Sequence, residues 1–220
     1  MTSRGKHPTE RTRVRRIPKR GAYDRTTIHA ILDEGLVCHV GFVHQGQPFV
    51  ITTLYARDGG RLLLHGSAAS RMLNALADGV DACVTVTLAD GIVVARSVFH
   101  SSMNYRSVVM LGTLRAIEEP AAKMKALHAL VEHLIPKRWN DSRGPNETEM
   151  KATSILEMSL DEASAKVRTG GPIDEEEDYA LPYWAGVLPF ATGVGKPVRD
   201  PKLKRGVKVP KYVSRYRRPR

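Results

Sequence analysis

The sequence predicts a mainly β, α+β fold: an antiparallel split β-barrel with flanking helices. About six segments alternate apolar and polar residues or are rich in β-branched residues, which is typical of strands. Their connections are short, as at Arg57-Asp58-Gly59-Gly60, and strands joined by so few residues pair in antiparallel fashion. Two or three other segments have the spacing of amphipathic helices.

The first half of the chain predicts a helix, a strand meander and a second helix. The first helix starts after Asp24, a good N-cap, and ends at Gly35. The second spans Ser67 to Leu76 and closes at Asp78-Gly79. The strands between them are predicted at residues 36–43, 48–56 and 61–65.

The second half predicts more strands around one long helix. The helix opens after Glu118-Glu119 and stops at Pro136. Gly112, in the middle of a long strand pattern, suggests a bulge or a close backbone approach. Strands are predicted at residues 82–88, 92–98, 105–117 and 153–160, a turn at 89–91, a polar loop at 137–149, a charged segment at 161–178 and an apolar segment at 179–190.

The net charge of +11 is concentrated at the two ends of the chain. Residues 1–25 carry +7 and residues 196–220 carry +10, which leaves −6 for residues 26–195. With 42% hydrophobic residues, the middle is rich enough for one buried core. We therefore predict basic flexible tails at 1–22 and 196–220, the barrel at 23–165, and a C-terminal arm packing on the barrel at 166–195. Nucleic acid is expected only on these tails, through phosphate contacts.

Several classes of protein are not indicated by the sequence. The longest apolar runs are far shorter than the ~20 residues of a membrane span. The basic N-terminus lacks the apolar stretch of a secretion signal, so we expect a cytoplasmic protein with no membrane partner. Cys38 and Cys83 are expected to be reduced thiols, and no histidine or cysteine spacing predicts a metal site.

The main candidate site is the stretch His65-Gly66-Ser67-Ala68-Ala69-Ser70-Arg71, for which three interpretations compete. Ser67 is a candidate helix cap that accepts a hydrogen bond from the Ser70 amide. His65 and Ser67 would be a base and a nucleophile only on a G-x-S-x-G turn, which is missing here. As an anion site, Gly66 lets the backbone come close, while the amides of the helix start, Ser67 and Arg71 suit a phosphate.

Two other segments carry polar residues in strand patterns. Arg106 and Ser107, after Tyr105, are polar where a strand should enter the core; alternatively, Arg106 is a charge that protects an edge strand. Thr52 and Thr53 are adjacent β-formers that alternatively only cover an exposed face.

Together these segments resemble the FMN-binding split-barrel superfamily typified by pyridoxamine 5′-phosphate oxidase, and most closely its 5-nitroimidazole reductase (nitroimidazole resistance) branch. The resemblance runs from about Tyr23 to Leu160 and rests on PFVITTLYARDGGRLLLHGSAASRMLNAL, YRSVVMLGTLRAIEE and MKATSILEMSLDE, of which the middle segment is the most specific. It makes residues 23–165 an FMN-binding barrel and implies a homodimer.

The resemblance also implies roles for single residues. Thr52, Thr53 and Leu54 would lie along the flavin ring, and His65, Gly66, Ser67 and Arg71 would surround the ribityl phosphate, with His65 also the catalytic histidine. The strand with Tyr105, Arg106 and Ser107 would reach the flavin from the facing side. Trp184 is similar to an aromatic residue that folds over the ring, or else it anchors the arm on the barrel. Because Met72 follows Arg71 where the oxidase proper has basic residues, pyridoxamine phosphate is not the expected substrate.

The leading hypothesis is therefore an FMN-binding oxidoreductase that passes electrons from a nicotinamide or other reductant to a small molecule, for example a nitroaromatic. FMN is expected ahead of a deazaflavin or FAD. Two alternatives remain: a flavin-binding or flavin-sensing protein without turnover, and a nucleic-acid-associated protein whose basic tails bind RNA while the barrel is a scaffold.

Overall fold

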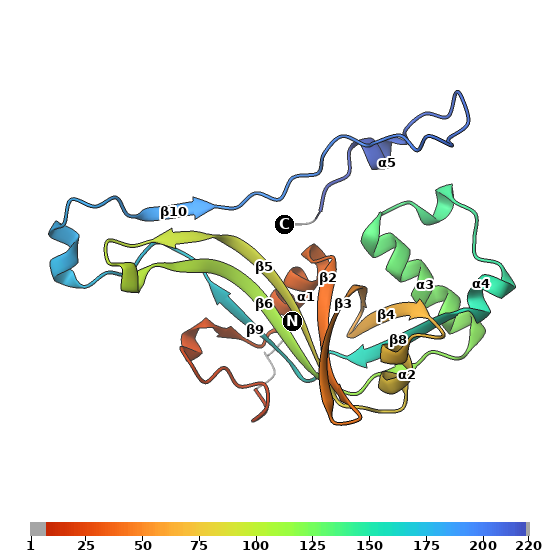
Figure 1. Cartoon of the computed structure of the whole chain (residues 1–220), viewed down its shortest axis with the longest axis horizontal. Coiled ribbons are helices and arrows are strands. Elements are labelled where there is room, and N and C mark those ends of the chain that lie inside the picture. Colours follow the sequence, from red (N-terminus) through yellow and green to blue (C-terminus); the bar gives the residue numbers. More distant parts are fainter. Residues whose placement is uncertain (1–7, 219–220) are drawn as a thin grey trace, which may run out of the picture.

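The computed structural model describes residues 8–218 and confirms the predicted fold class (Figure 1). Its strands join in one antiparallel sheet, in the order β1-β9-β6-β5-β2-β3-β4-β8-β7, with β10 added to β5. The strands in this part of the chain are β1 Gly21–Ala22, β2 Val37–His44, β3 Gln47–Asp58, β4 Arg61–Ser67, β5 Ala82–Val94, β6 Ser102–Gly112, β7 Arg115–Ala116, β8 Thr153–Ser159, β9 Ala163–Arg168 and β10 Gly186–Pro189. The helices are α1 Arg25–Glu34, α2 Arg71–Ala77, α3 Pro120–Leu134, α4 Glu147–Lys151 and α5 Lys211–Ser214.

The barrel is split because β3 changes its partner along its length. Residues 47–54 of β3 pair with β2, whereas residues 55–58 pair with β4, which leads on to β8. The main core fills the space between the two halves and includes Leu32, Val40, Leu64 and Met110, all with less than 1% exposure. A second cluster, around Ala126 and Leu130, packs α3 against the outside of β3, β4 and β8.

Helix α1 forms as the sequence predicts. The Asp24 carboxylate accepts a hydrogen bond from the Thr27 amide at 2.8 Å, which is the expected N-cap. The helix buries Ile28, Ile31 and Leu32 and ends at Gly35. The Tyr55 hydroxyl donates to the Leu32 carbonyl at 2.6 Å, so the end of α1 is fixed against β3.

Several local predictions are wrong. Helix α2 starts at Arg71, not at Ser67, because Ser67 still pairs with Thr153 as the last residue of β4. The predicted turn at residues 89–91 is only an irregularity inside one long strand, β5. Helix α4 lies at the end of the segment predicted as polar loop and extends just beyond it, and a reciprocal capping box between Asn146 and Glu149 explains it. Strands β9 and β10 lie in segments for which the sequence predicts no strand.

Both predicted tails contact the body of the protein within the described residues. Near the N-terminus, β1 pairs with β9, and the Val14 amide donates to the Tyr23 hydroxyl at 2.9 Å. At the other end, Tyr216 donates to the Leu134 carbonyl at 2.8 Å. Residues 1–7 of the predicted first tail and residues 219–220 of the second lie outside the described residues. The predicted start of the arm, residue 166, falls inside β9.

Candidate functional site

The split places the predicted ring-contacting residues at an open strand edge. Thr52, Thr53 and Leu54 pair with β2 on one side, opposite His39, Cys38 and Val37. On the other side, β4 pairs with β3 only from Tyr55 onward, so no strand of residues 8–218 covers this edge. Thr52 and Leu54 are exposed on the outer face of the sheet, whereas Thr53 is half-buried. Backbone groups and side chains are thus both available to a ligand.

His65 and Gly66 lie where β4 leaves β3 and continues along β8, opposite Ile155 and Ser154. A Cβ on Gly66 would lie 3.0 Å from Leu73 Cδ1, so a glycine lets α2 pack directly on β4. The His65 ring is half-buried, and its Nδ1 is buried without a hydrogen-bond partner in the described structure. Burial lowers the pKa of His65, which keeps the imidazole neutral at pH 7.

In the loop between β4 and α2, where the sequence predicts a phosphate site, three backbone amides already have partners within the protein. The Ala68 amide donates to Ala152 at 2.9 Å, and the Ser70 amide donates to the Ser67 carbonyl at 2.9 Å. The Ala69 amide donates to Ser67 Oγ at 3.2 Å, and Ser70, rather than Ser67, caps α2 by accepting from the Leu73 amide. The three loop amides, of Ala68, Ala69 and Ser70, thus already have acceptors, so a phosphate here would depend on side chains and on the first amides of α2.

Arg71 is the cation available for that role. It is exposed at the first position of α2, and its guanidinium lies 4.7 Å from the centre of the Phe49 ring on β3. Within residues 8–218 no carboxylate forms an ion pair with Arg71, so its charge is uncompensated. Phe49, which sequence reasoning missed, holds this cation beside the open edge of β3 by a cation–π contact.

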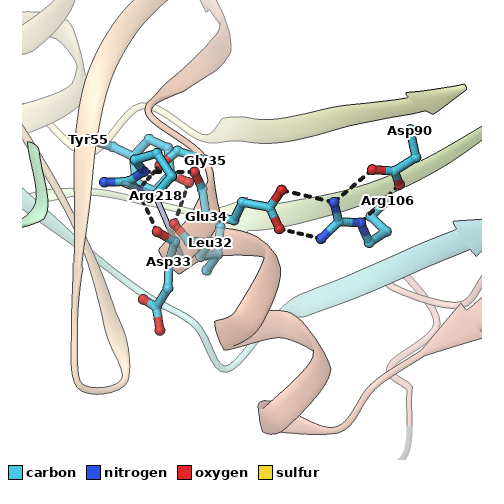
Figure 2. Close-up of polar contacts among 8 residues, drawn as sticks. All are labelled: Leu32, Asp33, Glu34, Gly35, Tyr55, Asp90, Arg106 and Arg218. Carbon is cyan, nitrogen blue, oxygen red and sulfur yellow. Dashed lines mark hydrogen bonds and ion pairs between the residues drawn. The ribbon is translucent and has the colours of Figure 1, made fainter. Parts of the chain in front are cut away.

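Arg106, in contrast, is fully engaged (Figure 2). Its guanidinium bonds Asp90 at 2.7 and 2.9 Å and Glu34 at 3.0 Å, which joins β6 to β5 and to the end of α1. These two carboxylates hold the pKa of Arg106 above its ordinary value. The edge-strand interpretation of Arg106 is wrong, because β6 pairs with strands on both sides. Its predicted flavin contact stays a prediction.

Trp184 lies far from the predicted ring-contacting residues on β3. It precedes β10, whose Gly186 pairs with Val94 of β5, and its side chain is 65% exposed. Thr52 of β3 pairs with His39 of β2, and His39 pairs on its other side with Thr85 of β5, so Thr52 lies level with Thr85. Nine residues of strand separate Thr85 from Val94, or roughly 30 Å at ~3.3 Å per residue. Within one chain, Trp184 therefore does not cover the Thr52 edge.

The remaining predicted residues lie along β6. Tyr105 pairs with Ala89 and Arg168, and Ser107 pairs with Thr87 and Lys166. The Ser107 hydroxyl donates to the Lys166 carbonyl at 3.4 Å. They are on the same sheet as Thr52 but three strands away in the strand order.

A cleft of about 610 Å³ opens elsewhere, at the β3–β4 turn, and no predicted site residue lines it. Its polar lining includes Asp58, Arg61, Arg115, Glu157 and Glu162. Arg61 is already paired with Asp58 and Glu157, so much of this polar surface satisfies itself.

Within residues 8–218, no group of three or more His, Cys, Asp or Glu side chains is placed to hold a metal ion. Nor do those residues contain a helix with the length and apolarity to cross a membrane.

Sequence reasoning also missed Arg218, because nothing in the pattern of a basic tail distinguishes one arginine from the next. Its guanidinium donates to the carbonyls of Asp33, Glu34 and Gly35, with distances of 3.1 Å to Glu34 and 2.9 Å to Gly35 (Figure 2). It also donates to the carbonyl of His133. A cation is favourable at this place, the C-terminal end of α1, where helix carbonyls point outward.

Comparisons with known proteins agree with this architecture. The family model described as pyridoxamine 5′-phosphate oxidase matches residues 24–167. The solved flavocytochrome Anf3 from Azotobacter vinelandii is 42% identical, with a TM-score of 0.91 over 96% of this chain and 98% of that chain. The FAD and heme binding protein from Mycobacterium smegmatis is 37% identical, with a TM-score of 0.85 over 88% of this chain and 95% of that chain.

A candidate 5-nitroimidazole antibiotic resistance protein from Bacteroides thetaiotaomicron is 21% identical, with a TM-score of 0.55 over 67% of this chain and 86% of that chain, and shares the fold. No curated protein matches the chain.

Proposed function

Because the chain belongs to the pyridoxamine 5′-phosphate oxidase family, a family of flavin-binding split barrels, we propose that it is a flavin-dependent oxidoreductase acting on a small molecule. The observation that carries the proposal is the arrangement at the split. As far as residues 8–218 show, a strand edge at Thr52 to Leu54 that no strand covers, a half-buried histidine with an unpartnered Nδ1, and an arginine without a carboxylate partner lie on adjacent elements there.

Each of these groups fits one part of a flavin. The guanidinium of Arg71 would hold the phosphate. The exposed Thr52 and Leu54 would lie along the ring, which carries the electron-transfer chemistry when bound. His65, kept neutral by burial, would donate or accept one hydrogen bond at the ring or the substrate.

The flavin can be FMN or FAD, because these groups address the part that the two cofactors share. The resemblance of the sequence alone favours FMN, whereas the relative from Mycobacterium smegmatis binds FAD. Its 37% identity supports FAD for this chain as well. Purified protein should be yellow, with absorbance near ~450 nm, and chromatography of the flavin released on denaturation identifies it. A colourless protein that takes up neither FMN nor FAD would contradict the proposal.

Turnover separates an oxidoreductase from a flavin-binding or flavin-sensing protein. We expect the flavin-loaded protein to oxidise a reduced nicotinamide, or another reductant, in the presence of a small acceptor such as a nitroaromatic. Bound flavin that never exchanges electrons with either partner would favour the binding or sensing function.

A second candidate is a flavocytochrome, in which haem accompanies the flavin. The two relatives with the highest identities reported above are a flavocytochrome and a FAD and heme binding protein, and both are matched over most of their length. A haem-loaded protein would show an intense band near ~410 nm that shifts on reduction, which flavin alone does not give. Expression with a haem precursor, followed by this spectrum, tests the candidate.

We also propose that the protein is a cytoplasmic homodimer. The outer face of β2 and β3 exposes Val37, Val43, Val50 and Leu54, with exposures of 45%, 55%, 72% and 37%. Exposed apolar side chains gathered on one sheet face are typical of an interface. Light scattering should give twice the mass of one chain, and Val50→Asp should lower it.

Nucleic acid remains a partner only for the basic ends. Residues 196–218 hold ten Lys or Arg against Asp200 alone. RNA binding through them would be weak and would fall steeply with salt concentration. The nucleic-acid alternative loses its basis if RNA binding persists in high salt, or if reversing charges in this segment leaves RNA binding unchanged.

A further inference from the structure

The chain after β9 forms an arm that is fixed at both ends rather than a loose tail. At its start, the buried Asp174 carboxylate accepts hydrogen bonds from the Arg96 and Ser97 amides and pairs with the Arg96 guanidinium at 3.1 Å. Strand β10 then pairs with β5, and the Phe190 amide donates to the Asp90 carbonyl at 3.0 Å.

The far end of the arm is held by α5 and Arg218. The Tyr212 hydroxyl donates to Asp141 at 2.7 Å, and Arg218 binds the carbonyls at the end of α1. We call residues 190–218, between the two attachments, the strap. Figure 1 shows the strap running from β10 along one side of the molecule to α5, and then returning toward α1.

This fixed segment, together with the neighbouring connection between β5 and β6, exposes large apolar and aromatic side chains to solvent. Just before β10, Tyr183 is 62% exposed and Trp184 65%, and Phe99, in the connection that follows β5, is 85% exposed. On the strap, Val194 is 59% exposed and Val198 95%. We call these five side chains the arm surface. Fixing such side chains in place while they face solvent lowers the entropy cost of docking them on another surface.

The distribution of charge indicates what that other surface is. After the buried and ion-paired Asp174, the arm begins with the acidic residues 175–178 and ends with the basic strap, while residues 26–195 carry −6. In a two-fold dimer the same surface contacts itself in opposite directions, so an acidic start meets a basic end. The chain therefore carries both halves of a complementary pair.

We propose that the arm surface and the strap dock onto a second copy of this chain, so that the arm of each copy packs against the other copy. The inference rests on the homodimer proposed above and adds that the arm is part of its interface. The flavocytochrome from Azotobacter vinelandii supports it: 96% of this chain, more than the barrel alone, superposes on that structure with a TM-score of 0.91. The arm is thus a shared structure rather than an accidental extension.

Sedimentation velocity over a dilution series tests the proposal on the full chain. The double variant Phe99→Asp/Val198→Asp should weaken the dimer by at least about tenfold, because buried aromatic and apolar anchors dominate interface energies. Lys125→Glu, which places a negative charge on the exposed part of α3 away from the arm, is the control and should leave the dissociation constant unchanged. Circular dichroism melts show whether each variant remains folded.

A second measurement keeps the test independent of any effect of the double variant on folding. Val198→Cys should react with a maleimide quickly in dilute protein and several-fold more slowly above the dissociation constant of the dimer. The arm inference is overturned if the double variant dimerises with unchanged affinity, or if the rate of maleimide labelling does not depend on protein concentration. Either result would still be compatible with a homodimer. A full chain that stays monomeric overturns both, and flavin binding by that monomer would still support the proposed function.

Discussion

At the scale of single residues, the candidate site depends on two side chains whose states differ. Arg71 is exposed and has no carboxylate partner within the described residues, so its charge is available to a ligand. His65 is half-buried, and its Nδ1 has no hydrogen-bond partner in the part of the chain that the structure describes. A cation without a carboxylate partner and an imidazole nitrogen without a hydrogen bond are both groups that an anionic cofactor could engage.

Replacing Arg71 tests the phosphate contact. Arg71→Gln should weaken flavin binding roughly 10- to 100-fold, because a hydrogen bond to a charged group contributes about 1.5–3 kcal/mol. Flavin fluorescence titration measures the affinity. Arg115→Gln, at an exposed arginine lining the separate cleft, is the matched control. Equal affinities in wild type and Arg71→Gln would remove Arg71 from the site.

The half-buried His65 should make stability depend on pH. Its pKa is lowered in the folded chain, so the unfolded chain takes up a proton more readily below its ordinary value of about 6.5. The free energy of unfolding should therefore fall as the pH drops from 7 toward 5. In His65→Gln this loss should be smaller, although His133, whose pKa burial also lowers, still contributes.

Urea unfolding at pH 7 and pH 5 measures the effect. His39→Gln, at an exposed histidine on β2, is the control. A pH dependence that is the same in wild type and His65→Gln would mean that His65 is accommodated in its charged form.

At the scale of elements, the arm depends on one close approach between β5 and β10. A Cβ on Gly91 would lie 2.7 Å from the Leu188 carbonyl oxygen and 3.1 Å from Pro189 Cα. Both neighbours are backbone atoms of β10, which cannot move without loss of the pairing between Gly91 and Pro189. The presence of glycine here is thus what allows β10 to join the sheet.

Gly91→Ala should therefore release β10 while the barrel stays folded. We expect a local destabilisation of about 1–3 kcal/mol, seen as faster amide exchange at Val187 and Leu188. Gly60→Ala, at a glycine whose added Cβ would contact nothing within 4 Å, should leave that exchange unchanged. Unaltered protection of β10 in Gly91→Ala would show that the strand can shift to make room.

Most elements were predictable because their signals are local. Asp24 and Gly35 bound α1 through a cap and a chain break, and alternation along residues 36–65 marks three strands. The start of α2 was not predictable, because Ser67 and Ser70 are both good caps in sequence. Pairing of Ser67 with Thr153, almost ninety positions away, assigns it to β4 and leaves the cap to Ser70.

At the scale of the whole molecule, the last described residue of the chain is attached to one of its first helices. Arg218 binds the end of α1, and the Glu34 side chain there pairs with Arg106, which pairs in turn with Asp90 (Figure 2). The Asp90 carbonyl also accepts from Phe190 at the beginning of the strap. The two attachments of the strap are therefore joined through one polar network across α1, β5 and β6.

Arg218→Ala should release the strap from α1. One guanidinium donates to four carbonyls, so its removal should cost about 1.5–3 kcal/mol of anchoring and increase the rate of limited proteolysis between residues 190 and 218. Arg217→Ala changes the same charge at the exposed neighbouring residue and is the control. Equal cleavage rates in the two variants would mean that Arg218 does not hold the strap.

By itself, the sequence determined the fold class, the helix that packs on the barrel and the segments from which a site is built. These follow from short-range periodicity, caps and motifs. Only the tertiary structure decided which of the candidate residues meet: Arg71 lies over Phe49 beside the open edge of β3, Arg106 is enclosed by two carboxylates, and Trp184 lies at the far end of β5. Strand register and the partners of each charge are settled by contacts between distant parts of the chain, and no local pattern encodes them.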